Sequence, residues 1–204
     1  MADTEHDAVR FFESQFRRQV ESGDFALNPF EQLALGYAKG TLLDLGCGLG
    51  NLALAAARRG CRVTALDASG TAIDHLRVAA LKEGLPIEAS LADLSNWSDS
   101  RKFDTVVAIG LLMFFPRDRA LSLLDSLRDG VAPGGCCIVN VLVEGTTYLD
   151  MFEPAHFHLF TTAELEATFG GWRIHVKQRD GFDAPGGSRK EFLTIVAQCP
   201  GKAS

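Results

Sequence analysis

The sequence predicts an α/β fold in which helices cover both faces of a mostly parallel, seven-stranded sheet. Short apolar runs alternate with longer segments of helical periodicity along most of the chain. A glycine-rich loop follows the first run, and no helical segment separates the last two runs. The alternation predicts parallel strands joined by right-handed crossovers. The last two apolar runs, with no helix between them, predict a hairpin, so the last strand is expected to enter the sheet antiparallel to its neighbours.

Two helices are expected before the first strand. Apolar side chains at helical spacing predict a helix over about residues 4–22, carried by Val9, Phe12, Phe16 and Val20. Asn28-Pro29 marks a turn, and a second, shorter helix is expected over about residues 30–38. We therefore expect residues 1–39 to form a helical lid on the main unit at 40–204, with the whole chain as one compact domain.

The remaining elements alternate as far as residue 143. Strands are expected at 41–45, 62–67, 87–91, 103–109 and 136–143. Helices are expected at 51–59, 71–83 and 116–128; Gly60 and Gly84 end the first two, and Pro116 lies near the start of the third. The alternation then stops, because a helix at 161–169 precedes two strands at 172–178 and 191–198. Thr161 or Thr162 can cap that helix, with Glu164 in its first turn.

Composition limits the classes of partner and compartment. A net charge of −6 disfavours duplex nucleic acid, which requires a basic surface. No stretch has the roughly 18 apolar residues of a membrane span, and the polar N-terminus is unlike a secretory signal. The 5 cysteines form no CxxC pair, which predicts free thiols in a reducing cytoplasm and no metal site. A small-molecule substrate is the expected partner, and the chain is expected to be a monomer or a homodimer.

The glycine loop is the strongest functional signal. It follows the first predicted strand and reads Asp44-Leu45-Gly46-Cys47-Gly48-Leu49-Gly50. A dinucleotide fingerprint requires Gly-x-Gly-x-x-Gly, but Asn51 occupies the third glycine position and Gly50 comes one residue early. A carboxylate at Asp44 would repel a pyrophosphate at the helix N-terminus, whereas it suits a ligand that carries an ammonium and a sulfonium. The spacing therefore favours S-adenosylmethionine over NAD or FAD, although a tight turn without a ligand is the alternative for the glycines alone.

Two further acids end the next two predicted strands. Asp67, followed by Ala68, lies about 20 residues after the glycines, where a carboxylate typically binds ribose hydroxyls. Asp93, followed by the apolar Leu94, can accept a hydrogen bond from the adenine amine while Leu94 packs on the ring. The alternatives are a helix N-cap for Asp67 and a turn acid for Asp93. Because strand ends of an α/β sheet meet at one edge, the three acids are expected to converge.

The end of the fourth predicted strand is expected to lie beside the methyl donor. Small residues at Ala108 and Gly110 would allow the sulfonium to approach the backbone closely, and Met113 and Phe114 could exclude solvent. For Leu111, Leu112 and Phe115 a place in the core is the better interpretation. The complete set expected to bind the cofactor is Asp44, Gly46, Cys47, Gly48, Gly50, Asn51, Asp67, Ala68, Asp93, Leu94, Ala108, Ile109, Gly110 and Met113.

The strand ends, acids and terminal hairpin resemble the Rossmann-like class I methyltransferase fold over about residues 40–198. A closer resemblance is to the tellurite-resistance (TehB-like) methyltransferase family. It is carried by Leu43–Gly48, Leu112–Phe114, Ala132–Gly135, Phe160–Leu165, Gly171-Trp172 and Phe192–Ala197. The resemblance implies that residues 40–204 form a catalytic domain that converts S-adenosylmethionine to S-adenosylhomocysteine.

The acceptor is expected to bind between the N-terminal helices and the segment 148–160. His156 and His158 alternate there, so either could serve as a base or an anion contact; surface histidines near a helix start are the alternative. The TehB-like family has a His-Arg pair and a further Arg between its last two strands. Here the loop at 179–189 lacks the His, and the resemblance implies that Arg189 stands for the further Arg. Tyr148 is a secondary candidate.

The expected activity is methyl transfer to a small acceptor. The first choice is a chalcogen oxyanion, such as tellurite or selenite, or a thiol. An O- or N-methyltransferase of a small metabolite is the alternative among enzymes, which a usable His158 in a dry pocket would favour. An S-adenosylmethionine-binding protein without catalytic activity is the alternative from another class.

Overall fold

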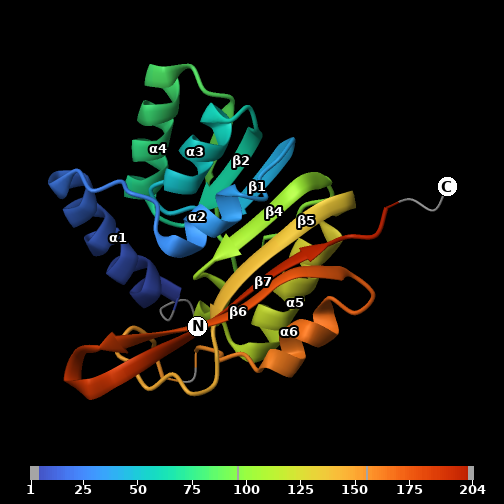
Figure 1. Ribbon diagram of the computed structural model, residues 1–204. Helices are drawn as coiled ribbons and strands as arrows, with labels where there is room; N and C mark the ends of the chain where they lie inside the picture. The colour runs from blue at the N-terminus through green and yellow to red at the C-terminus, as the bar shows by residue number, and fades with distance from the viewer. Residues whose placement is uncertain (1–4, 96, 155, 202–204) are drawn as a thin grey trace.

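The computed structural model describes residues 5–95, 97–154 and 156–201, with side chains described from residue 10 onward. A single sheet of seven strands runs through the molecule in the order β3-β2-β1-β4-β5-β7-β6 (Figure 1). Its strands are β1 (Thr41–Leu45), β2 (Arg62–Asp67), β3 (Ile87–Leu91), β4 (Phe103–Ile109), β5 (Val131–Leu142), β6 (Arg173–Ala184) and β7 (Ser188–Gln198). Strand β7 is antiparallel to β5 and to β6, whereas β1 to β5 pair in parallel, which confirms the predicted fold.

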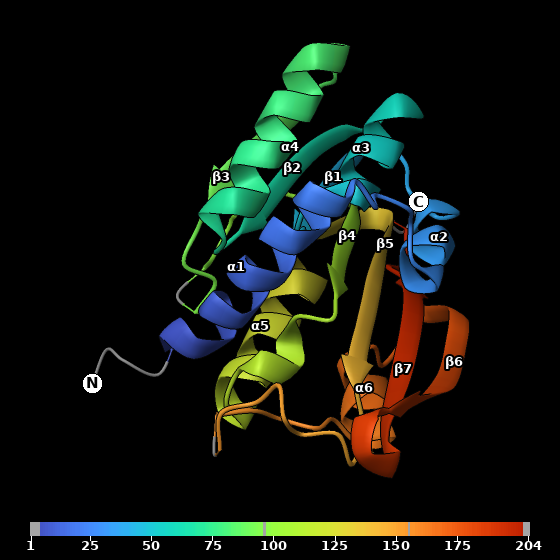
Figure 2. The same ribbon diagram turned by 90° about the vertical axis from the view of Figure 1, so that its left-hand side faces the viewer.

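Helices cover both faces of the sheet. Apolar side chains of α2 (Pro29–Leu35), α3 (Asn51–Arg58) and α4 (Gly70–Glu83) share one core with one face. The other face packs on α5 (Arg117–Asp129) and the region around α6 (Thr162–Thr168). Helix α1 (Glu5–Ser22) lies in front of the carboxyl ends of the central strands (Figure 2). In the described residues, no helix is long and apolar enough to cross a bilayer.

Local sequence signals explain where several helices start and stop. Asn28 and Glu31 form a capping box at α2, with Pro29 in the first turn. Thr161 and Glu164 form a second capping box at α6, as the sequence predicts. Gly84 ends α4 in the left-handed conformation, with φ of 64°. The two capping boxes fix segments near the carboxyl edge of the sheet, whereas Gly84 ends α4 at the opposite edge, before β3.

The terminal hairpin is longer than the sequence predicts. The segment expected as a loop at 179–189 instead extends β6 and β7, and the turn is the short 3-10 helix η2 (Pro185–Gly187). Strand β5 likewise begins at Val131 rather than at 136. Glycine and charged residues have low strand propensity, but cross-strand pairs can override it. Here β6 and β7 pair continuously from Val176↔Val196 to Ala184↔Ser188, which extends both arms beyond the apolar runs.

A glycine before α3 provides a test of this local architecture. Gly50 has φ of 78°, and a Cβ atom there would lie 2.5 Å from Cδ1 of Leu76. We expect Gly50→Ala to lower the free energy of unfolding by about 2–4 kcal/mol through left-handed strain and overpacking. Gly70→Ala is the control, because a Cβ at Gly70 meets no atom within 4 Å. Chemical denaturation checks the pair, and equal stabilities for both variants would contradict the packing.

Candidate functional site

A cleft of about 1690 Å³ opens at the carboxyl edge of the sheet, where the ends of β1, β2 and β4 meet α1 and α2. Pockets for small molecules are usually about 300–1,000 Å³, so this cleft has room for a cofactor and a second molecule. All residues expected to bind a cofactor line it, except Gly50 and Ala108. Ala108 lies in the core at 1% exposure, and Gly50 packs against α4 at the start of α3. These two positions can therefore shape the site only through their neighbours.

The glycine loop turns the chain sharply between β1 and α3. Gly46, Gly48 and Gly50 all have positive φ, at 73°, 53° and 78°. The N–H of Gly46 donates to the carbonyl of Leu66 at 2.8 Å, so the loop is fixed against the end of β2. A Cβ at Gly48 would lie 3.2 Å from the ring of Phe16, which shows how closely α1 approaches the loop. Because these residues have no side chains, the backbone of the loop leaves a narrow space between β1 and α1.

Asp67 ties the end of β2 to the glycine loop. Its Oδ2 accepts the N–H of Gly48 and its Oδ1 accepts the N–H of Ser69, both at 2.8 Å. Burial raises the pKa of Asp67, against the effect of these backbone donors. The alternative interpretation as a helix cap fails, because Ser69 caps α4 by accepting the N–H of Ala72. Carboxylate oxygens have further lone pairs, so Asp67 can also accept hydroxyl donors from the cleft.

Asp44 is the most unusual acid of the site. Its side chain is almost fully buried, and its Oδ2 has no hydrogen-bond partner among the described residues. Burial, with Glu31 and Asp67 nearby, raises the pKa of Asp44 to about 8. The Oδ1 of Asn51 is likewise buried without a partner. Because buried acceptors without donors are rare and costly, this end of the cleft fits a ligand rich in N–H donors and positive charge.

The far end of the cleft combines an acid with an apolar wall. Oδ1 of Asp93 accepts the N–H and the hydroxyl of Ser95, at 2.9 and 2.6 Å, as the turn interpretation predicts. Asp93 still lines the cleft, together with the buried Leu94. Met113, in the 3-10 helix η1 (Leu112–Phe114), and Ile109 line the middle. The arrangement offers a polar acceptor beside a hydrophobic surface, which suits a flat heterocycle.

Comparisons with known proteins agree with this geometry. A family model described as a methyltransferase domain matches residues 42–135. A carboxy-S-adenosyl-L-methionine synthase of Ectopseudomonas mendocina is 32% identical over 175 residues, covering 80% of this chain and 67% of that protein. The chain belongs to the class I S-adenosylmethionine-dependent methyltransferases. This confirms the family resemblance and the cofactor predicted from the glycine spacing.

Two TehB comparisons support the same family. A probable S-adenosyl-L-methionine-dependent methyltransferase TehB of Haemophilus influenzae is 29% identical over 134 residues, covering 65% of this chain and 46% of that protein. The crystal structure of TehB from the same species has a TM-score of 0.74 at 21% identity, covering 89% of this chain and 65% of that one, which shows the shared fold. The methyltransferase spans about half the length of the first curated relatives that it matches.

Helix α1 is held by hydrogen bonds beside the glycine loop. The carboxylate of Glu13 on α1 accepts hydrogen bonds from the hydroxyls of Ser69 and Thr71, at the start of α4. Phe12 meets Phe114 edge-on, with 5.0 Å between ring centroids. The role of Glu13 could not be predicted from the sequence, because only the folded chain brings positions 13 and 69 together. Thus α1 contacts both the loop that shapes the cofactor end and the segment after β4.

The histidines expected on the acceptor side diverge. His156 is exposed and lines the cleft, with Nδ1 3.8 Å from Oε1 of Glu153. His158 does not line it, since its Nε2 lies 3.1 Å from Oε2 of Glu164, which also caps α6. Of the pair, His156 is therefore the side chain within reach of a molecule in the cleft.

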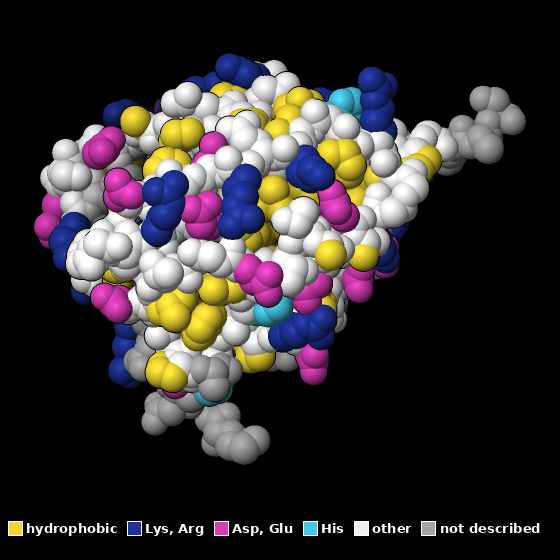
Figure 3. Space-filling model, turned by 60° about the horizontal axis from the view of Figure 1, so that its bottom comes forward, with side chains coloured by type: hydrophobic (Ala, Val, Ile, Leu, Met, Phe, Trp, Pro, Cys, Tyr) yellow, Lys and Arg dark blue, Asp and Glu magenta, His cyan; other side chains and the backbone are white. Residues whose placement is uncertain are grey.

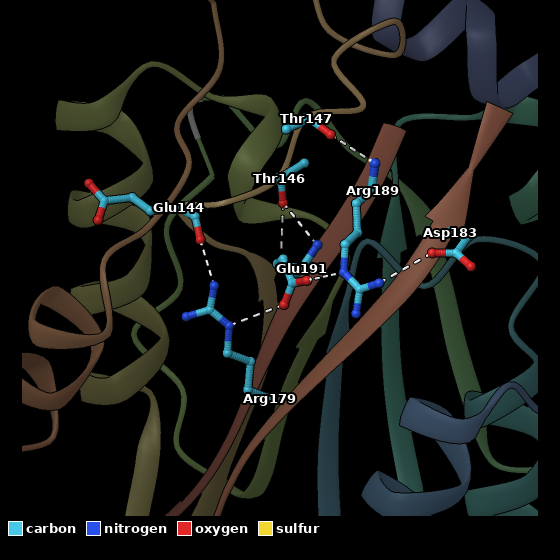
Figure 4. A network of polar contacts seen from close by, with 7 residues as sticks. All are labelled: Glu144, Thr146, Thr147, Arg179, Asp183, Arg189 and Glu191. Carbon is cyan, nitrogen blue, oxygen red and sulfur yellow. Dashed lines mark hydrogen bonds and ion pairs between the residues drawn. The ribbon is translucent and has the colours of Figure 1, made fainter. Parts of the chain in front are cut away.

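The expected arginine contacts also lie outside the cleft. Figure 4 shows Arg179 and Arg189 converging on the carboxylate of Glu191, while Arg189 also reaches Asp183. The guanidinium of Arg179 donates to the carbonyl of Glu144 at 2.7 Å. Successive residues of a strand point to opposite faces, so Arg189 and Glu191 face away, whereas Lys190 and Phe192 line the cleft. Lys190 could not be predicted as a cleft residue from the sequence, because a segment expected as a loop has no regular alternation of faces.

Apolar side chains surround the entrance on the hairpin side. On the face that forms the lower end of the molecule in Figure 1, they reach the surface between basic and acidic side chains (Figure 3). Phe152 stacks on Phe157 and meets Phe114, with centroid distances of 4.7 and 5.0 Å. Tyr148 and Met151 line the cleft beside them. The hairpin side of the cleft is therefore mainly aromatic, in contrast to the acidic end beside the glycine loop.

Proposed function

We propose that this methyltransferase transfers a methyl group from S-adenosylmethionine to the sulfur of a small organic thiol. The observation that carries the proposal is the buried carboxylate of Asp44, whose Oδ2 lacks a donor beside the glycine loop. An ammonium on the ligand supplies such donors and the opposite charge. Asp67 and Asp93 line the same cleft and offer acceptors for the ribose hydroxyls and the adenine amine of the same molecule.

The chemistry requires little covalent assistance from the chain. S-adenosylmethionine supplies a methyl group that is already activated on a sulfonium. The residues of the cleft hold the reactants in line and exclude water, which together account for a large part of the rate of such reactions. A general base is needed only where the acceptor keeps its proton near neutral pH, and a thiol loses its proton readily. For an acceptor that keeps its proton, His156 is the candidate general base, because it is the histidine of the pair His156 and His158 that lines the cleft.

The side chains around the acceptor favour a thiol over a bare chalcogen oxyanion. Phe12, Phe114 and Phe152 form one aromatic wall. Burying a tellurite or selenite there would require several charged donors. Arg179 and Arg189 are paired with Glu191 outside the cleft. The soft sulfur of an organic thiol matches an apolar wall, whereas an O- or N-methyl acceptor would depend more on His156. The free thiols of the chain fit a reducing compartment such as the cytoplasm.

A panel of acceptors tests the proposed function. The protein is incubated with S-adenosylmethionine and, separately, with tellurite, selenite, thiols and phenols, while S-adenosylhomocysteine formation is followed. Turnover with thiols, and slower turnover with tellurite, is the expected result. Turnover with phenols alone would assign the chain to O-methylation. Cofactor binding without turnover on any acceptor would favour the binding protein without catalytic activity.

The lid contact gives a separate prediction. Glu13→Gln removes the charge that Ser69 and Thr71 donate to, while leaving Phe12 and Phe16 in place. We expect hydrogen exchange of α1 amides to rise about fivefold, corresponding to about 1 kcal/mol, with faster release of S-adenosylhomocysteine. Glu21→Gln is the matched control, because Glu21 lies exposed on the same helix. Equal exchange in both variants would mean that the aromatic contacts alone hold the lid.

A further inference from the structure

The hairpin side of the cleft has a second aromatic wall in addition to that of Phe12 and Phe114. Phe30 of α2 lies 5.0 Å from Phe192 of β7 between ring centroids. Leu142, fully buried at the end of β5, and Tyr148, in the segment after it, line the same part of the cleft. A ligand between these side chains and the wall of Phe12 and Phe114 would contact ring faces and edges on both sides. This shape suits a flat or otherwise compact apolar body.

A lysine side chain lies in this apolar part of the cleft. Lys190 lines the cleft, and its Nζ lies 4.6 Å from the centroid of the Tyr148 ring. Within the part of the chain that the structure describes, no carboxylate lies within ion-pair distance of this ammonium. The adjacent acid, Glu191, points to the other face and is shared by two arginines. Partial burial lowers the pKa of Lys190, with no opposing charge to offset the effect.

In the described part of the chain, none of the acids that line the cleft forms an ion pair with this ammonium; Glu153, on the same side as Tyr148, lies 3.8 Å from His156 instead. Glu31 of α2 caps its own helix by accepting the N–H of Asn28 at 2.8 Å. Asp44 and Asp67 lie at the cofactor end, beside the glycine loop. An anion would stabilise a partly desolvated ammonium that contacts only an aromatic ring. Hydrogen bonds between charged groups are stronger than those between neutral groups. Lys190 therefore favours a ligand that carries a negative charge.

We propose that Lys190 is a specificity-determining residue that selects acceptors with a compact apolar body and a carboxylate. The inference rests on the proposed methyl transfer to a thiol and names the class of thiol. The apolar body packs between the aromatic walls while its carboxylate meets the ammonium of Lys190. In the reaction, the thiol proton leaves to solvent and a new S–CH₃ bond forms. The C–S bond of the sulfonium breaks, and its electron pair stays on the departing thioether.

A matched pair of acceptors tests the inference. Para-mercaptobenzoate and thiophenol share the aromatic body and the thiol, but only the first carries a carboxylate. We expect Lys190→Met to lower kcat/KM for para-mercaptobenzoate about tenfold or more, and for thiophenol by less than about threefold. Lys190→Arg should restore most of the loss, because it keeps the charge. Lys177→Met is the control, since Lys177 pairs with Glu166 away from the cleft.

Binding without turnover separates this inference from the proposed function. Benzoate, which cannot be methylated on sulfur, is titrated into the complex with S-adenosylhomocysteine and followed by calorimetry. We expect benzoate binding that weakens about tenfold in Lys190→Met. No benzoate binding, or equal binding by both proteins, would overturn the role of Lys190 even if thiols are methylated. Equal loss of kcat/KM for both thiols would also overturn it. Benzoate binding sensitive to Lys190, without turnover of any thiol, would overturn the proposed function alone.

Discussion

Asp67→Ala is expected to weaken the binding of S-adenosylhomocysteine by about 1–3 kcal/mol, or about 5- to 150-fold in Kd. The variant removes the acceptor proposed for the ribose hydroxyls. It also removes the hydrogen bonds to the N–H groups of Gly48 and Ser69, both at 2.8 Å. The glycine loop therefore loses one of its connections to the end of β2, while the hydrogen bond from Gly46 to the carbonyl of Leu66 remains. Isothermal titration calorimetry with the wild type and the variant measures the change.

Two controls separate a lost ligand contact from general damage. Asp74→Ala makes the same charge change on an exposed residue of α4, where Asp74 lies 3.8 Å from Arg77, and it should leave the affinity unchanged. Asp67→Asn keeps an acceptor oxygen, so an intermediate loss is expected. Thermal unfolding without ligand shows whether each variant is folded. An unchanged Kd for Asp67→Ala would remove Asp67 from the site.

Cofactor binding is also expected to release a proton from Asp44. The pKa of Asp44 is raised to about 8 in the protein without ligand, so this carboxyl is mostly neutral at pH 7. An ammonium beside it favours the charged form and lowers its pKa. Binding at pH 7 should then release close to one proton. The affinity should increase about tenfold per pH unit between pH 6 and 8, then level off above the pKa of the free protein.

Asp44→Asn removes this dependence. Calorimetry at pH 7 in buffers of different ionisation enthalpy should show proton release for the wild type and close to none for the variant. The sign for stability is opposite to that of a salt-bridged acid. Because the folded pKa is raised above the ordinary value near 4, the free energy of unfolding without ligand falls as the pH rises from about 4 to 8. Identical proton release by the variant and by the wild type would assign the proton to another group, such as Glu31.

The cofactor half of the site could be predicted because its signals are local. The glycine loop, Asp67 and Asp93 follow strands whose apolar runs are short and clearly bounded. Parallel topology brings the ends of such strands to one edge, so three separate acids could be assigned to one cleft. Of the residues predicted to bind the cofactor, Gly50 and Ala108 do not line the cleft, because they pack behind its surface.

The acceptor half could not be predicted to the same extent, because it depends on tertiary pairing. The charged segment of the hairpin has the composition of a loop, yet it forms two paired arms. That pairing decides that Lys190 faces the cleft and Arg189 faces away. The alternation of His156 and His158 suggested a shared face, but Glu164 holds His158 at the start of α6. Neither outcome can be read from residue spacing.

The most direct test of the central claim is a comparison of S-adenosylmethionine with NADH as ligands of the same cleft. Both are titrated by calorimetry into the wild-type protein and into Asp67→Ala. S-adenosylmethionine should bind the wild type at one site per chain and bind the variant more weakly, while NADH should show no binding at the same concentrations. Tight binding of NADH without binding of S-adenosylmethionine would contradict the account.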